Sequence, residues 1–246
     1  MGKTMKIIAS LIIFFTATFA AGAKEIRVLA FSQVEPGIYH HLSNLDGIAL
    51  IEELGLKRGW KVDVTHNVGS FNDQRLSMYD VVAFINSTGD ILNEEQQASF
   101  EKYIRNGGGY VGTHSAADTE HDWEFYGKMV GGYFKSHPER SDLLGSTHLE
   151  NNNHPALAHL KETVPAVEEW YDYTANVRGK PGFTVLMTVD ENTYEGGISG
   201  DDHPITWVNE FEGGRAFYSG LGHFFQKDHP FLSELLIGGV EWAAGE

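Results

Sequence analysis

Cysteine is absent from the 246-residue chain, and its absence excludes three kinds of chemistry. The fold cannot be held by disulfide bonds, no thiolate is available as a nucleophile, and thiolate-based zinc sites cannot form. The core must therefore be stable without covalent cross-links. A chain of this length can bury enough surface for that.

Basic residues are scarce. The chain has 18 Lys and Arg against 34 Asp and Glu, with a formal net charge of −16. We expect no nucleic-acid partner, because binding the phosphates requires basic patches. The acidity favours solubility. The glycine runs at residues 107–109 and 213–214 lack the spacing of a phosphate-binding loop, so we expect no nucleotide cofactor.

The first residues have the pattern of a secretory signal peptide. Lys3 and Lys6 precede an apolar run over residues 7–20, and Ala21-Gly22-Ala23 offers the small residues of a cleavage site. The run is shorter than the about 20 residues of a membrane span. We expect residues 1–23 to be removed and residues 24–246 to form a single domain, exported to the periplasm or the medium and not bound to a membrane.

The first half of the chain alternates between strand and helix patterns. Strands are expected at residues 26–31, 61–65, 79–85 and 110–112, and helices at residues 42–57, 93–107 and after His114 up to residue 131. The second half has more turns, with strands at 167–174 and 183–189, a hairpin over 205–219 and a last helix at 230–242. The pattern predicts an α/β three-layer fold with a mostly parallel central sheet, helices on both faces and β-rich additions in the second half.

Histidines follow several of the predicted strands. In GGGYVGTHSAADTE (residues 107–120), a strand turns sharply at His114, while His40 and His223 follow the first and a late strand. Since sites form at the carboxyl ends of parallel strands, we expect these three side chains to converge. An imidazole there can act as an acid or base or ligate a divalent metal such as zinc, and the sequence leaves both roles open.

Further candidates lie near the elbow and on loops. Asp118 is a candidate for orienting His114, with helix capping as the alternative, and we count it with His114 and His223 as catalytic. Aromatic rings just past the elbow suit sugar binding, with core packing as the alternative, and loop residues beside proline are further substrate-binding candidates. These are Trp123, Tyr126, His137, Asp202 and His203.

Several long stretches resemble the ThuA-like family, named for trehalose utilisation. They include INSTGDILNEEQQASFEKYIRNGGGYVGTHSAADTEHDWEFYGKMVGGYFKSHP, EEWYDY, GDDHPITW and GGRAFYSGLGH. The resemblance implies the flavodoxin-like fold of class I glutamine amidotransferases. Those enzymes have a cysteine at the elbow, whereas this chain has His114 and no cysteine. Glutamine amidotransferase chemistry is therefore not expected.

The resemblance also implies a substrate class. The family is linked to trehalose and to oxidised (3-keto) sugars, so we expect an enzyme of carbohydrate catabolism that carries out elimination, isomerisation or hydrolysis with His114, His223 and a possible divalent metal. One alternative is a sugar-binding module without catalysis, and another is a structural subunit of a larger exported complex. The sugar, the reaction, the metal and the oligomeric state stay open.

Overall fold

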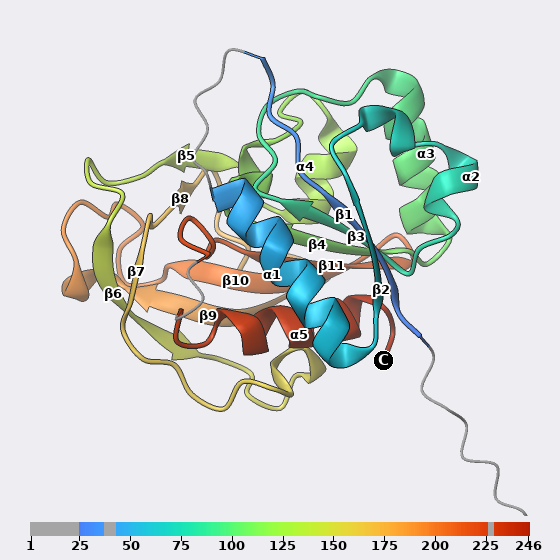
Figure 1. The fold of residues 1–246 in the computed structure, drawn as a ribbon. Helices are drawn as coiled ribbons and strands as arrows, with labels where there is room; N and C mark the ends of the chain where they lie inside the picture. Colours follow the sequence, from blue (N-terminus) through green and yellow to red (C-terminus); the bar gives the residue numbers. More distant parts are fainter. Residues whose placement is uncertain (1–24, 37–42, 226–228) are drawn as a thin grey trace, which may run out of the picture.

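A nine-stranded sheet forms the centre of the protein (Figure 1). The computed structural model describes residues 25–36, 43–225 and 229–246. In chain order the elements are β1 (Arg27–Phe31), α1 (Ser43–Arg58), β2 (Lys61–Thr65), α2 (Asp73–Leu76), β3 (Val81–Ile85), α3 (Glu94–Arg105), β4 (Gly109–Thr113), α4 (Glu124–Val130), β5 (Phe134–Ser136), β6 (Leu143–Leu149), β7 (Ala166–Glu168), β8 (Asp172–Tyr173), β9 (Phe183–Asp190), β10 (Pro204–Phe211), β11 (Gly214–Ser219) and α5 (Leu232–Ala243). Short 3₁₀ helices lie at Val68–Ser70, His114–Asp118, Pro155–Leu157 and Glu191–Thr193.

One half of the sheet is parallel and has the flavodoxin-like strand order. Strands β2, β1, β3, β4 and β11 lie side by side in that order, and each pair is parallel. The last residue of β4, Thr113, lies opposite the last residue of β11, Ser219. The residues that follow these two strands therefore begin side by side at one edge of the sheet.

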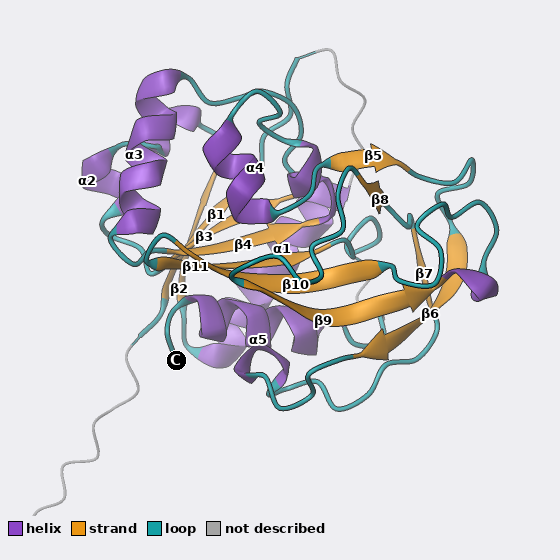
Figure 2. Ribbon diagram, turned by 180° about the vertical axis from the view of Figure 1, so that it is seen from behind, coloured by secondary structure: helices purple, strands orange, loops and turns teal. Residues whose placement is uncertain are grey.

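Helices cover both faces of this half (Figures 1 and 2). The apolar side chains of α1 and α5 pack on one face with Val28 and Phe217. Those of α3 and α4 pack on the other face with Phe84 and Tyr110. The predicted three-layer architecture is confirmed. Asn93 and Gln96 form the capping box that starts α3, as their spacing predicts.

The second half of the sheet is antiparallel. Strands β10, β9, β6 and β7 follow β11 in that order, and β10 with β11 forms the predicted hairpin. The β-rich additions are confirmed. The single strand expected at residues 167–174 is instead two short strands, because β7 pairs with β6 while β8 pairs with β5 in a separate two-stranded sheet. Residues 169–171 cross between them.

The helix expected directly after His114 starts later than predicted. Only the 3₁₀ turn His114–Asp118 follows the elbow, and α4 starts at Glu124. A helix dipole needs a run of aligned peptides, so this short turn does not supply the helix N-terminus that the sequence pattern indicates.

Two predictions fall outside the described residues, namely the signal peptide at residues 1–23 and the placement of His40. Among the residues that the structure describes, no helix combines the length and the apolar character needed to span a membrane.

Candidate active site

His114 sits at a strained elbow. It follows β4 directly, and its backbone φ is +44°, in the left-handed region that side chains other than glycine seldom adopt. The phenol of Tyr218, on the neighbouring strand β11, donates a hydrogen bond of 2.8 Å to the His114 carbonyl oxygen. The imidazole is 3% exposed. Strain that the surroundings hold in place is characteristic of functional sites.

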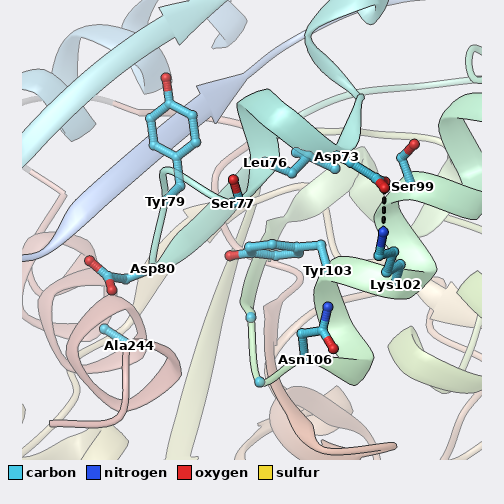
Figure 3. Close-up of a pocket in the computed structure, with 12 residues that line it drawn as sticks. Asp73, Leu76, Ser77, Tyr79, Asp80, Ser99, Lys102, Tyr103, Asn106 and Ala244 are labelled. Atoms are coloured by element: carbon cyan, nitrogen blue, oxygen red, sulfur yellow. Dashed lines mark hydrogen bonds and ion pairs between the residues drawn. The ribbon is translucent and has the colours of Figure 1, made fainter.

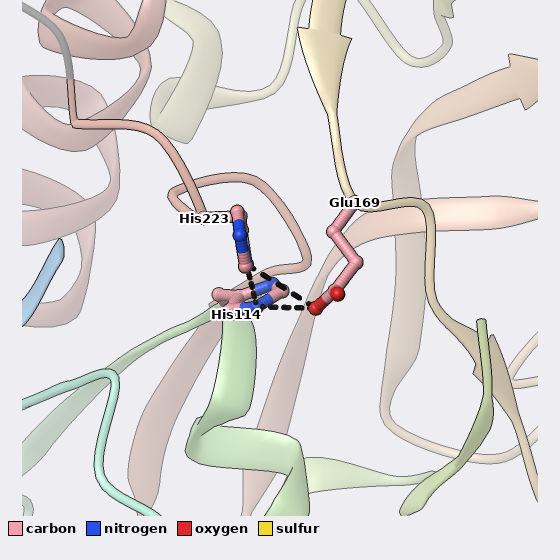
Figure 4. Close-up of side chains that lie close together, drawn as sticks. All are labelled: His114, Glu169 and His223. Carbon is pink, nitrogen blue, oxygen red and sulfur yellow. Dashed lines mark hydrogen bonds and ion pairs between the residues drawn. The ribbon is translucent and has the colours of Figure 1, made fainter. Parts of the chain in front are cut away.

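Three side chains converge at this elbow (Figure 4). His114 Nε2 lies 3.1 Å from Nδ1 of His223, which is in the loop after β11. Oε2 of Glu169, which follows β7, lies 3.1 Å from His114 Nε2 and 3.2 Å from His223 Nδ1. The parallel half of the sheet thus supplies two imidazoles, and the antiparallel half supplies a carboxylate.

The Glu169 carboxyl is held in its ionised form. Burial alone would raise its pKa, but when the facing nitrogens of His114 and His223 carry protons, their hydrogen bonds and charge outweigh burial and hold the pKa well below the usual range. The phenol of Tyr171 is buried beside this carboxylate, and burial followed by the Glu169 charge raises the pKa of Tyr171 well above its ordinary value.

The three atoms His114 Nε2, His223 Nδ1 and Glu169 Oε2 form a triangle of short contacts. Protons alone do not satisfy all three contacts of this triangle. A ring nitrogen either donates a proton or accepts one, and His114 Nδ1 faces the Gly220 carbonyl oxygen at 3.2 Å, so the neutral ring presents a lone pair at Nε2. That lone pair faces an ionised carboxylate oxygen. Protonating His114 Nε2 moves the conflict to His223. If Nδ1 of His223 carries a proton, two N–H groups face each other; if it carries a lone pair, that lone pair faces the carboxylate.

A single cation between the three atoms removes this conflict, because three lone pairs would then face it. Ligand atoms about 2.0–2.2 Å from one metal are about 3–3.5 Å apart, and the observed separations are 3.1–3.2 Å. Two imidazoles and one carboxylate suit zinc, iron or manganese and leave coordination positions open for a substrate. His114, Glu169 and His223 therefore fit a divalent metal ion.

Aromatic rings and a further histidine border the triangle. The Tyr171 ring packs on His114 with a centroid separation of 4.1 Å, and Phe134 packs on Tyr171 at 4.3 Å. Since β5 and β8 pair, His137 after β5 lies near residues before β8. Its Nε2 is 3.6 Å from Oε1 of Glu169, and its side chain is 36% exposed.

The other candidates past the elbow have different surroundings. Asp118 accepts a 2.8 Å contact from His121 Nε2 and does not orient His114. The Tyr126 ring is fully buried, and its hydroxyl is bound to Tyr110 and to the Ala116 carbonyl. Trp123 is 7% exposed and belongs to the same core cluster. The sugar contacts expected of Trp123 and Tyr126 are replaced by core packing.

Asp202 and His203 lie in a different cluster. Asp202 pairs with Arg178 at 2.7 Å. His203 is 1% exposed, with Nδ1 2.8 Å from Glu191 and Nε2 2.9 Å from the Tyr171 carbonyl oxygen. With Asp172 this forms a second group of possible metal ligands, but its carboxylates already accept hydrogen bonds from residues 198–200. His203 therefore supports the backbone of Tyr171 through the contact with its carbonyl oxygen.

Two larger cavities lie away from this site, and neither is lined by a group of possible metal ligands among the described residues. A cavity of about 460 Å³, whose lining residues are drawn in Figure 3, lies at the amino ends of β3 and β4. His114 follows the other end of β4. Two charged groups of the cavity, Asp73 and Lys102, pair with each other, and burial followed by a hydrogen bond to Asp63 raises the pKa of Tyr79 to about 12. Another, of about 660 Å³, lies against α4.

Sequence reasoning missed Glu169. The rule used for the histidines applies to the carboxyl ends of parallel strands, whereas Glu169 follows the antiparallel strand β7. A signal was present in AVEEWYDY, where two adjacent carboxylates stand among apolar and aromatic residues. Charges in such a stretch are either buried with partners or functional.

The fold and site define a flavodoxin-like α/β protein with a buried histidine–histidine–glutamate centre in place of a nucleophilic cysteine. The sequence model of the ThuA family, described as trehalose utilisation, matches residues 27–243. The chain belongs to this family, which confirms the resemblance and places the protein among carbohydrate-utilisation proteins. No curated protein matches the chain.

Solved structures share this fold. A ThuA-like protein from Bacteroides uniformis is 22% identical, with 94% of this chain and 95% of that chain covered and a TM-score of 0.73. One from Parabacteroides merdae is 20% identical, with 90% and 91% covered and a TM-score of 0.69. A β-galactosidase from Bacillus circulans sp. alkalophilus is 15% identical and matches over 88% of this chain but 31% of its own, with a TM-score of 0.59.

Proposed function

We propose that the protein is an exported, metal-dependent enzyme of carbohydrate catabolism that acts on 3-keto disaccharides or glycosides by elimination or isomerisation. The triangle of His114, Glu169 and His223 carries the proposal, because its three short contacts call for one cation. A divalent ion there would supply Lewis acidity toward a ketone oxygen. Hydrolysis, the third expected reaction, would require a positioned water as well.

His137 is the base in this proposal. Its Nδ1 lies 2.6 Å from the Pro138 carbonyl oxygen and donates to it, so the neutral ring has a lone pair at Nε2. A proton on the carbon next to a ketone is acidic, and it would transfer to Nε2 while the C–H electron pair forms a C=C bond with the carbonyl carbon and the C=O π pair moves onto the ketone oxygen. In elimination the C=O bond would then re-form as the bond from the β-carbon to the leaving oxygen breaks and that oxygen takes up the proton; in isomerisation the proton would return to another carbon or oxygen of the same unit. The Glu169 carboxylate, 3.6 Å away, would stabilise the imidazolium that forms.

The aromatic rings supply a surface for the sugar. Phe134, Tyr171 and His137 lie together at the edge of the site, and the His137 ring stacks on Phe134 at a centroid separation of 6.0 Å. Such a wall binds the apolar face of a sugar ring and keeps water from the reacting carbon. The trehalose-utilisation family supports a sugar as the substrate.

Metal analysis tests the site. Protein purified without chelators and without a His-tag should contain about one first-row metal ion per chain, and His114→Ala should lose the ion together with activity. A chain that contains no metal and binds none of zinc, manganese, iron or cobalt when titrated would contradict the proposal.

Turnover tests the chemistry. Residues 24–246 should convert a 3-keto disaccharide, and His137→Gln should lower the rate by roughly 10²–10⁴, the usual contribution of a positioned base, while retaining the metal. Binding of the sugar without turnover would favour the non-catalytic module. N-terminal sequencing of exported protein should begin near Lys24, and an intact Met1 would contradict signal cleavage.

A further inference from the structure

Glu168, the neighbour of the proposed ligand Glu169, has its own set of contacts. It is the last residue of β7 and is fully buried, with 0% exposure. Its Oε1 accepts a hydrogen bond of 3.0 Å from the Gly222 amide, and its Oε2 accepts one of 3.1 Å from the His223 amide. One carboxylate thus binds the backbone of the residue that supplies a proposed metal ligand.

A buried histidine extends this arrangement. His229 Nδ1 accepts from the Leu232 amide at the start of α5, 3.1 Å away, so Nε2 carries the ring proton in the neutral form. That Nε2 lies 3.4 Å from Oε1 of Glu168 and has no well-aligned hydrogen-bond partner. Glu168 therefore lies between the His223 backbone and the residues that start the last helix.

An apolar residue or an amide would be easier to bury at this position. A buried charge is unfavourable unless several hydrogen bonds compensate it, and here both oxygens are directed at adjacent backbone amides. Metal ligands must be held to within about 0.5 Å, and the groups that hold them contribute strongly to affinity. His223 follows a glycine in a loop, so no regular element fixes its backbone.

We propose that Glu168 is a positioning residue that fixes the backbone of His223 and so sets the geometry of the metal centre. The inference rests on the proposed metal site. Glutamine at 168 retains only one carbonyl oxygen and places an NH₂ group against one of the two backbone amides. The variant should therefore release one of them and let the His223 ring move.

Cobalt(II) binding to the full mature chain tests this. Glu168→Gln should weaken cobalt binding by about 10–100-fold and shift the visible absorption of the bound ion, which loss of stability alone would not do. Glu120→Gln is the matched control. Glu120 is also buried and accepts two backbone amides, from Ile91 and Leu92, but it has no contact with the triangle. The Glu120→Gln variant should bind cobalt with an affinity within about two-fold of that of the wild type.

Backbone amide exchange provides a second readout that does not depend on metal. In the wild type, the Gly222 and His223 amides should exchange slowly, and Glu168→Gln should accelerate their exchange while Glu120→Gln leaves it unchanged. If the wild type binds no cobalt, the proposed function fails, and amide exchange still decides whether Glu168 fixes this loop. Unprotected amides in the folded wild type, or unchanged cobalt binding and exchange in folded Glu168→Gln, would overturn the inference.

Discussion

The backbone strain at His114 predicts that glycine is more stable there than alanine. At φ +44°, a residue with a Cβ is disfavoured by about 1–2 kcal/mol. Glycine escapes this penalty but loses roughly 0.5–1 kcal/mol more conformational entropy on folding. Taken at their midpoints, about 1.5 and about 0.75 kcal/mol, the two effects leave His114→Gly more stable than His114→Ala by roughly 0.75 kcal/mol. For a chain of this size, that corresponds to a difference in Tm of roughly 1–4 °C.

The comparison removes the imidazole in both variants, so lost metal binding and lost ring contacts cancel. Calorimetry with a chelator present measures the two transitions. Ala49, exposed in the middle of α1, provides the control with the opposite sign. There the Ala49→Gly change should lower stability by about 1 kcal/mol, since glycine weakens a regular helix. If alanine at 114 is as stable as glycine, the elbow is not strained as described.

Three further predictions concern the metal site, the elbow and the turn that follows it. Wild-type protein with metal at about 100 times its Kd should lose roughly 5–10 °C in Tm when chelated, whereas Glu169→Gln should be unaffected by chelator; equal shifts would refute its role as a ligand. Tyr218→Phe removes the hydrogen bond to the His114 carbonyl and should lower stability by about 1 kcal/mol, and an unchanged denaturation midpoint would count against that contact. Burial raises the pKa of Asp118, and hydrogen bonding and charge from His121 only partly oppose this. The folded state therefore binds the Asp118 proton more tightly than the unfolded state does. The stability that this group contributes is lost as the pH rises from just above 3.8 through the folded-state pKa. Asp118→Asn should therefore flatten the pH dependence of stability there, and an unchanged slope would contradict the assignment.

Periodicity predicted most of the parallel half of the fold. Strands β1 and β3 are short apolar runs, β2 alternates between polar and apolar residues, and α3 starts at the capping box formed by Asn93 and Gln96. In such segments local preference and tertiary packing agree. The same alternation led to the carboxyl-edge rule, which brought His114 and His223 together.

The antiparallel half was harder to predict at β7 and β8, because these two strands are very short and pair with different partners. Residues 167–174 have one continuous β pattern, but Ala166–Glu168 and Asp172–Tyr173 belong to different sheets. The break between them carries Glu169 and Tyr171, so the missed strand boundary and the missed ligand are one error. Pairing partners depend on contacts that are distant in sequence, and no local pattern encodes them.

Trp123 and Tyr126 show a related limit. Their position just past the elbow is compatible with both a sugar platform and core packing, and only the path of α4 decides between them. Because a 3₁₀ turn replaces the first turns of the expected helix, α4 starts later and directs both rings into the sheet face. A shift of a few residues in a helix start is enough to change such an assignment.

The adjacent glutamates make the site unequally sensitive to changes in chain length. Side chains alternate along an extended chain, so a one-residue shift exchanges which of them faces each side. A shift that moves Glu168 into the place of Glu169 retains a carboxylate at the histidines but puts Val167 beside the Gly222 and His223 amides. The opposite shift puts Trp170 at the histidines and abolishes the centre. Since β7 is a three-residue edge strand, the loop that precedes it should tolerate insertions and deletions to different degrees.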